Sequence, residues 1–383
     1  MVRYSFVPGE PRRYSALNHF PGNVSVCSRF IVEAKAKLDL YTPQVEPDKF
    51  HAGYRAAYQH FGPNRWKELH RWADGFVDRD NKFVKEFQTS FDSSFWELYL
   101  WAVLKEYGMT VDFSHATPDF VVTSPTEMVV EATVASNAQG QPGSAYNPME
   151  APIPDDLHEY NRQSILRLAN GINSKTKKYR AKYSSLKHVQ GKPFVIAIAP
   201  FDRPHFTMQC NRAIEALLYG IYVDEQEFVD DPKHDFPPPS VLIDSVVKTN
   251  GADVPLAIFA DDSHSDISAV IFSTLATWSK VGALAEDDEN ETTIYQALRY
   301  NPNSHKPHYY RLGKSEHAEV ICDGLRIYHN PFASLPIDDT VFRRPEVFQL
   351  IPDHENEALI ADIREYQLVW RQARTTRKVR AAE

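Results

Sequence analysis

The sequence has few cysteines and no long apolar run. Its three cysteines, Cys27, Cys210 and Cys322, form no CxxC pair among 383 residues, so a disulfide framework is not expected. No stretch approaches the roughly 18 to 20 consecutive apolar residues needed to cross a bilayer. The first residues lead into prolines and arginines without an apolar segment, so a secretory signal is not expected either. These absences predict a protein of the reducing cytoplasm that does not use a membrane as a partner.

Several motifs of nucleotide and hydrolase chemistry are also missing. No GxxxxGK[ST] loop is present, so no ATP-driven activity is implied. No GxSxG elbow and no plausible Cys–His spacing support nucleophilic catalysis. The 22 Phe and 19 Tyr residues are scattered, which favours core packing over a base-stacking platform. A composition of 43% hydrophobic and 24% charged residues is typical of a folded chain, and the length predicts one large domain or two.

The charge is acidic overall but uneven along the chain. A net charge of −9 argues against coating nucleic acid by bulk attraction. The span from Tyr160 to Phe201, however, contains no Asp or Glu. A solvated helix face is the simplest interpretation of such a run, and a surface for nucleic acid is the alternative. The basic residues of this span are Arg162, Arg167, Lys175, Lys177, Lys178, Arg180, Lys182, Lys187 and Lys192, and a second basic patch comprises Arg371, Arg374, Arg377, Lys378 and Arg380.

The hydrophobic pattern predicts an α/β protein. We expect an N-terminal, mostly helical or irregular extension at 1–85, a central unit at 86–205, and a C-terminal α/β extension with a basic tail at 206–383. The central unit is predicted to run helix, three strands, loop, helix, strand. Its predicted segments are a helix around Phe95–Leu104, strands at Met109–Phe113, Asp119–Thr123 and Glu127–Val134, a loop at 137–156, a helix at Asp156–Tyr183 and a strand at Lys192–Ala199. Later strands, near Ala257–Phe259, Ile267–Phe272 and Val320–Asn330, are expected to extend the same sheet.

The predicted hairpin brings two carboxylates together. If it turns about Pro125, residues whose numbers sum to 250 face each other, so Asp119 is opposite Glu131. Directly opposed side chains share a face, with Cβ atoms about 4.5–5.5 Å apart, and two like charges in that position destabilise a hairpin. A divalent cation between them would remove this penalty, and Mg²⁺ is suited to carboxylates, phosphate and water. The simpler alternatives are a turn cap for Asp119 and a solvated face for Glu131.

Glu97 is the third unusual carboxylate. It is the only carboxylate in the apolar and aromatic segment from Phe95 to Leu104. An unpaired buried carboxylate costs several kcal/mol, so Glu97 must face a polar cavity, meet a cation or carry a proton. Pairing with a core arginine is the structural alternative to a role in a site.

The order of these elements resembles the PD-(D/E)XK nuclease superfamily. The resemblance rests on Glu97 in the first helix, on Pro118-Asp119 opening one strand, and on Glu131-Ala132-Thr133 in the next, and it covers about 110 residues. It implies a restriction endonuclease-like αβββαβ core with a mixed central sheet. It further implies Mg²⁺ or Mn²⁺ held by Asp119, Glu131 and the Ala132 carbonyl, with Glu97 completing the ligand shell or orienting a water molecule.

One residue departs from the family pattern. The lysine that usually follows the Glu by two residues is replaced by Thr133, which carries no positive charge to stabilise the transition state. Some members of the superfamily place this lysine on the following helix. Lys175 is the best local substitute, because it borders the apolar stripe of that helix, whereas Lys178 lies further round towards solvent. Arg167, Lys175, Lys178 and Lys182 are the residues expected to follow a nucleic-acid backbone.

The resemblance implies a metal-dependent endonuclease that cuts nucleic acid in a restriction or defence setting; DNA is favoured as the substrate, and RNA is the alternative. Catalysis would fall to Glu97, Asp119, Glu131 and Lys175. One alternative is a nuclease-like fold that binds nucleic acid without cutting it, for which Thr133 is the main support. Another is a structural subunit of a homodimer or larger complex, which would account for the long flanking segments.

Overall fold

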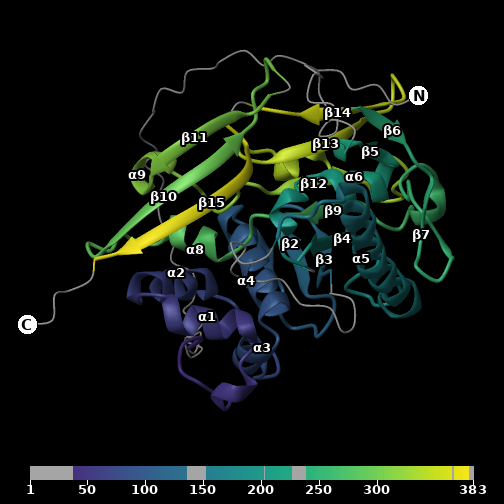
Figure 1. Ribbon diagram of the computed structural model, residues 1–383. Helices are drawn as coiled ribbons and strands as arrows, with labels where there is room; N and C mark the ends of the chain where they lie inside the picture. Colours follow the sequence, from purple (N-terminus) through teal and green to yellow (C-terminus); the bar gives the residue numbers. More distant parts are fainter. Residues whose placement is uncertain are drawn as a thin grey trace, which may run out of the picture.

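The computed structural model describes residues 38–135, 152–201, 203–226, 239–304, 306–364 and 366–378, and every structural statement concerns these ranges. Cys27 and most of the loop predicted at 137–156 lie outside them. Within these ranges the chain folds into helices around a large sheet (Figure 1). None of the described helices combines the length and apolar composition that a membrane crossing requires.

The centre of the molecule is an eight-stranded mixed sheet, in the order β1-β2-β3-β4-β9-β12-β13-β14. β3, β4 and β9 run parallel, as do β12 and β13, and the other neighbouring pairs are antiparallel. The fold is therefore mixed α/β, and strands after residue 200 do extend the sheet formed before it. The strands are β1 (Thr110–Val111), β2 (Phe120–Ser124), β3 (Met128–Val134), β4 (Phe194–Ala199), β9 (Ala269–Phe272), β12 (Arg326–His329), β13 (Phe348–Asp353) and β14 (Ala358–Asp362).

The predicted order of helix, three strands, helix and strand is confirmed. α4 (Phe91–Glu106) precedes β1 to β3, and α5 (Leu157–Lys178) connects β3 to β4. Asp156 caps α5 by accepting a hydrogen bond from the Glu159 backbone, at 2.8 Å, which satisfies one of the free amides of the first turn. The helix continues as a π-helical turn, Tyr179–Tyr183, so the helical segment ends where the sequence predicted.

The central sheet is buried on both faces. All six residues of β4 are buried, as its continuous apolar sequence predicts. Val195 and Ala197 pack in the cluster that contains α4, while Ile196 and Ile198 pack in the cluster that contains α5 and α6 (Arg212–Tyr219). Successive residues of a strand point to opposite faces, so one strand supplies both layers.

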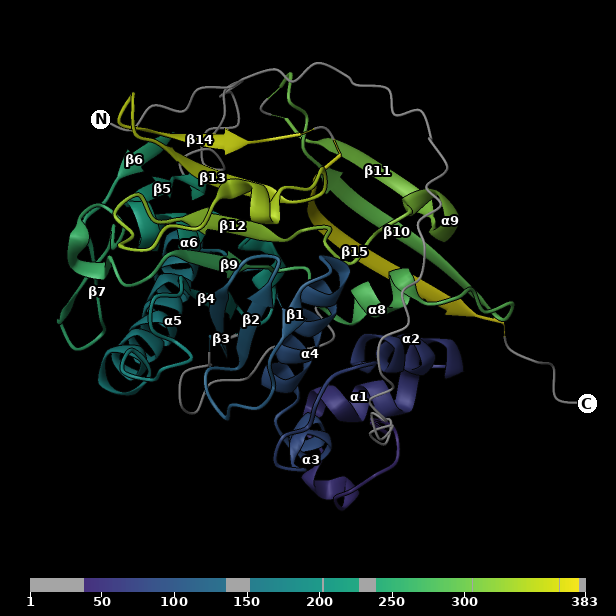
Figure 2. The ribbon, with the colours of Figure 1, turned by 180° about the vertical axis from the view of Figure 1, so that it is seen from behind.

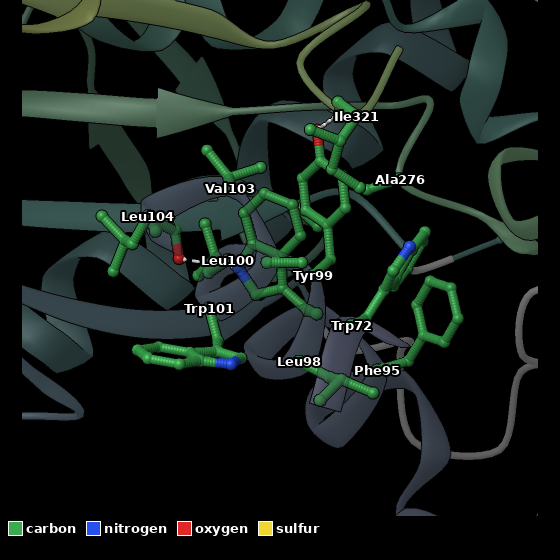
Figure 3. Packing of buried hydrophobic residues seen from close by; sticks show 14 of the residues in the cluster. Trp72, Phe95, Leu98, Tyr99, Leu100, Trp101, Val103, Leu104, Ala276 and Ile321 are labelled. Carbon is green, nitrogen blue, oxygen red and sulfur yellow. Dashed lines mark hydrogen bonds between the residues drawn. The ribbon is translucent and has the colours of Figure 1, made fainter. Parts of the chain in front are cut away.

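Two buried hydrogen bonds attach α4 to its surroundings. The Trp96 indole donates to the Ala197 carbonyl at 3.1 Å, and the Tyr99 hydroxyl donates to the Ile321 carbonyl at 3.0 Å. Figure 3 shows Tyr99 and Ile321 meeting beside Trp72 and Phe95. A helix that is apolar on nearly every side needs cover all round, and here it lies between the sheet and the N-terminal helices. These helices are α1 (Ala52–His60), α2 (Pro63–Ala73) and α3 (Phe83–Thr89), and Figure 2 shows them on the side of α4 away from α5. They contact α4 from its first turn, where Phe91 meets Phe87, to its last, where Lys105 donates to the Arg71 carbonyl.

A second, three-stranded antiparallel sheet lies beside the main body, in the order β11-β10-β15. Its inner face meets a buried cluster of charges centred on Glu319. The Glu319 carboxylate accepts from Arg371 at 2.7 Å and from His317 at 2.7 Å, and it also pairs with Lys280. The strands are β10 (Glu291–Arg299), β11 (His308–Gly313) and β15 (Leu368–Arg377), and the nearby helices are α8 (Trp278–Leu284) and α9 (Lys314–His317).

One expectation from the sequence is wrong here. Residues 257–259 form no strand, because Ala257 has a positive φ of 53° and the Ile258 and Phe259 amides donate to carbonyls at the end of α6. Of the second basic patch, Arg371 is buried and paired with Glu319, and Arg380 lies outside the described residues. The remaining short strands are β5 (Ile221–Val223), which pairs with β6 (Ser240–Leu242), and β7 (Ser245–Val247), which pairs with β8 (Asp253–Pro255).

Candidate functional site

The hairpin of β2 and β3 has the register that the sequence predicted. Phe120 pairs with Val130 and Val122 with Met128, so the paired numbers sum to 250. Asp119 directly precedes β2, and one further step of this register brings it opposite Glu131. The Asp119 carboxylate accepts a hydrogen bond from the Ala132 backbone amide at 2.7 Å. Ala132, predicted to contribute its carbonyl, is thus seen to contribute its amide to the neighbouring carboxylate.

Glu131 is the best-enclosed carboxylate of the site. Its side chain is 1% exposed. One oxygen, Oε1, accepts from Lys175 Nζ at 2.8 Å, from Lys178 Nζ at 3.1 Å and from the Tyr183 hydroxyl at 3.3 Å. The other oxygen, Oε2, is buried and has no hydrogen-bond partner. Because an unsatisfied buried oxygen is costly, Oε2 is the atom of this site that most needs a further partner.

The close approach of α5 to the sheet brings both lysines to Glu131. A Cβ added at Gly171 would lie 2.9 Å from Ile198 and 3.8 Å from Thr133, so only glycine permits this contact without displacement. Lys175 lies one helical turn after Gly171 and therefore projects from the same face. The helix also occupies the space beside Thr133, the position where the resembled family has its lysine. The close packing of α5 on β3 and β4 therefore accounts both for a small residue at position 133 and for a lysine at position 175 that reaches Glu131.

Lys178 contributes more than the helical pattern predicted. It was expected to point towards solvent, and its side chain is indeed 43% exposed. Its ammonium group nevertheless turns back to Glu131 and lies 4.9 Å from the centre of the Tyr183 ring. A flexible four-carbon chain permits this, and a cation over an aromatic face is a favourable contact.

Burial and mutual repulsion raise the pKa values of the other two carboxylates. Burial raises the pKa of Asp119 to about 6, helped by the charge of Glu131 and opposed by Lys175 and by the hydrogen bond from Ala132. Burial also raises the pKa of Glu97 to about 8, helped by the charge of Asp119 and opposed by Arg79. The three acids therefore share one electrostatic environment, although they come from α4, β3 and the residue before β2.

Arg79 belongs to the site although no pattern in the sequence indicated it. It lies in the segment between α2 and α3, far in sequence from the carboxylates. Its guanidinium donates to the His115 carbonyl at 2.7 Å and to the Pro118 carbonyl at 3.4 Å. It thus holds the segment that leads into Asp119, and its charge lowers the pKa values of both Asp119 and Glu97.

Much of the basic run is engaged within the protein. Arg180 pairs with Asp266, Arg162 with Glu159 and Lys192 with Glu127, in addition to the two lysines on Glu131. Among the residues predicted to bind nucleic acid, Lys182 is exposed, whereas Arg167 is half-buried with its Nε lacking a partner. The run is therefore a mixture of internal ion pairs and outward lysines.

The donors fit a hard cation in kind, but they are not gathered as a ligand cluster. Within the described ranges, no group of three or more His, Cys, Asp or Glu side chains is arranged to hold a metal ion. Asp119 and Glu131 offer carboxylate oxygens, which Mg²⁺ and Mn²⁺ prefer, and Glu131 Oε2 lacks a partner. Holding a cation would require Glu131 to exchange at least part of its contact with the two lysines.

Comparison with protein-family models, with curated proteins and with solved structures finds no match to this chain.

Proposed function

We propose that this protein is a metal-dependent endonuclease that hydrolyses phosphodiester bonds of DNA, with a restriction endonuclease-like core formed by α4, β1 to β4 and α5. The observation that carries the proposal is the set of contacts around Glu131. This buried carboxylate lies opposite Asp119 in the continued strand register, accepts from two lysines, and keeps one oxygen without a partner. Buried like charges with a cationic rim are typical of sites that handle a charged substrate.

Each side chain has a distinct role in this proposal. Asp119 and Glu131 would hold Mg²⁺ or Mn²⁺, with the Ala132 carbonyl as a further ligand. When bound, the ion supplies Lewis-acid stabilisation of the scissile phosphate and lowers the pKa of water. Lys175 would turn from Glu131 to the phosphate and stabilise the charge that develops there.

Glu97 suits the role of orienting a water molecule better than that of a metal ligand. With a pKa of about 8, its carboxyl group holds a proton at neutral pH. A protonated carboxyl group donates a hydrogen bond and binds cations poorly. Lys175 and the hydrogen bond from Ala132 keep Asp119 easier to ionise than Glu97, so the two acids differ in charge near neutrality.

The decisive experiment measures cleavage of single- and double-stranded DNA and RNA in Mg²⁺, in Mn²⁺ and in EDTA. Asp119→Asn and Glu131→Gln should each lower cleavage on the order of a thousandfold, because each removes a charged ligand while keeping the shape of the side chain. Glu127→Gln is the matched control, since Glu127 lies in the same hairpin turn and is exposed. Activity that survives both site changes, or that persists in EDTA, would refute the assignment.

A binding module that does not cut nucleic acid is the second candidate. It is favoured by Thr133 and by the two lysines, which already compensate the charge of Glu131 without a metal ion. It predicts affinity for DNA that is equal in EDTA and in Mg²⁺, with no product in either. If neither binding nor cleavage is found, mass measurement of the native complex would test the third possibility, a structural subunit.

A further inference from the structure

The two faces of the three-stranded sheet differ sharply. Residues that pair across antiparallel strands project to the same face. On one face, Tyr295, Ala297 and Arg299 of β10 are buried, as is Arg371, the partner of Ala297 on β15. This inner face packs on the main body. The opposite face carries the alternate residues of the same strands.

The outer face combines aromatic rings with arginines. Its first cross-strand row is Leu298, with Tyr309 on one side and Trp370 on the other. Tyr309 is 58% exposed, and Trp370 is half-buried. The next row contains Arg311, which is exposed, and the row after it contains Arg374. The outer positions of the paired residues are Thr292, Ile294, Gln296 and Leu298 on β10, Tyr309, Arg311 and Gly313 on β11, and Trp370, Gln372, Arg374 and Thr376 on β15.

None of these outer positions on the three described strands is an Asp or a Glu, although the chain has a net charge of −9. The acidic residue of β10, Glu291, belongs to the inner face, where it pairs with Arg65. The part of the outer face around Tyr309, Trp370 and Arg311 is thus a locally basic and aromatic surface on an acidic protein. The other end of the face, at Thr292 and Ile294, lines a pocket that also contains the acidic residues 286–289. The basic and aromatic part is complementary to a strand that has negative phosphates and unpaired, stackable bases.

We propose that the outer face of β11-β10-β15 binds single-stranded nucleic acid. Tyr309 and Trp370 lie on the two strands that flank β10, so strand spacing separates them by about 10 Å. Each can offer a ring to a base, and Arg311 lies about 7 Å further along β11 to meet a phosphate. Gln296 and Gln372 supply amide donors and acceptors between these positions.

This surface is separate from the candidate nuclease site. In both views the three-stranded sheet lies on the side of the molecule away from α5 (Figures 1 and 2). The inference goes beyond the proposed function, because binding at this face can be measured without any cleavage. If the protein is a nuclease, the face would hold a strand at a distance from the point of cutting.

The test uses the full chain, a fluorescein-labelled oligothymidine as probe, and fluorescence anisotropy in EDTA. Tyr309→Ala should weaken binding about tenfold, the loss expected for one stacked base. Arg311→Ala should weaken it less and lower the slope of log affinity against log salt by about one. The matched controls are Phe332→Ala and Lys85→Ala, which remove another exposed aromatic ring and another exposed cation elsewhere. Oligouridine and duplex DNA arms distinguish RNA and double strands from single-stranded DNA.

Photocrosslinking with a bromodeoxyuridine oligonucleotide gives a second readout that does not depend on a variant. The crosslinked peptide should contain Tyr309 or Trp370. Equal affinity of Tyr309→Ala, Arg311→Ala and the two controls, or crosslinks confined to α5, would overturn the inference. The proposed function is unaffected by either outcome, since it depends on cleavage and on Asp119 and Glu131. Conversely, binding that requires Tyr309 in a protein that never cuts DNA would sustain this inference alone.

Discussion

Glu131 and Glu319 are both buried carboxylates, but they lie in opposite electrostatic settings. Glu319 meets Lys280, Arg371 and His317, so cations outnumber the acid and hold the pKa of its carboxyl well below the usual range, against the effect of burial. Glu131 meets two lysines as well, but it shares its surroundings with Asp119 and Glu97, whose pKa values are raised. In the first cluster the cations keep the carboxylate ionised, whereas in the second the neighbouring acids raise one another's pKa values. Repulsion between neighbouring carboxylates is common in functional sites and rare in ion pairs that only stabilise a fold.

The comparison predicts the largest loss of stability at Glu319. Glu319→Gln removes the nearest counter-charge of the buried Lys280 and Arg371, which should lower the free energy of unfolding by about 3–5 kcal/mol. Urea unfolding measures the change. Glu127→Gln, which removes an exposed partner of Lys192, is the control and should change stability by less than about 0.5 kcal/mol. If Glu319→Gln lowers the free energy of unfolding by less than about 1 kcal/mol, the ion pairs around Glu319 do not stabilise the fold.

The effect of pH should have opposite signs at the two regions. The lowered pKa of Glu319 means that its contribution is present above the usual value of 4.5 and is lost as the pH falls. The raised pKa of Glu97 means that ionising it costs stability as the pH rises from 4.5 to about 8. Glu97→Gln should therefore stabilise the protein at about pH 8, by on the order of 1–2 kcal/mol, and should change little below pH 4.5.

Thermal unfolding of the Glu97→Gln variant across this pH range measures the difference. Glu106→Gln, at the exposed end of the same helix, serves as the control and should show no such trend. Equal stability of Glu97→Gln and the unaltered protein at both ends of the range would mean that Glu97 is not held in the protonated form.

The smallest expected effect is a shift in the pKa of Asp119 when the charge of Lys175 is removed. Its charge lowers the pKa of Asp119, so Lys175→Met should move that pKa upward from about 6, by a fraction of a unit. If Asp119 must be ionised for cleavage, the acidic limb of the pH–rate profile should move in the same direction. Lys177→Met, an exposed neighbour on the same helix, should leave the profile unchanged. A shift to lower pH in Lys175→Met would contradict the electrostatics described here.

The sequence was sufficient for the parts of the fold that depend on local pattern. The hairpin register followed from a turn about Pro125, and the buried character of α4 followed from its unbroken apolar segment. The return of Lys178 to Glu131 could not be predicted, because a helical pattern places a backbone position but not the bend of a flexible side chain. Arg79 could not be predicted for a different reason. Its guanidinium donates to backbone carbonyls near Asp119, and a hydrogen bond to a backbone carbonyl leaves no pattern in the sequence.

The three-stranded sheet was missed altogether. Its strands β10 and β15 are separated by β11, α9 and three strands of the central sheet, and the charges beneath it come from three distant segments. Lys280, His317, Glu319 and Arg371 look like ordinary surface residues until the strands pair. The scattered aromatic residues were likewise assigned to the core, and only the register shows that Tyr309 and Trp370 share an outer face.

The two hydrogen bonds that hold α4, from Trp96 and from Tyr99, have a practical consequence for anyone redesigning this protein. They flank Glu97 on a helix whose other side chains are almost all enclosed, so the helix cannot slide or spin to compensate for an altered acid. Moving the carboxyl group by one position would swing it by about 100° into tightly packed hydrocarbon. A redesign must therefore change the length or chemistry of residue 97 itself, because no adjacent position on α4 can direct a carboxyl group into the site.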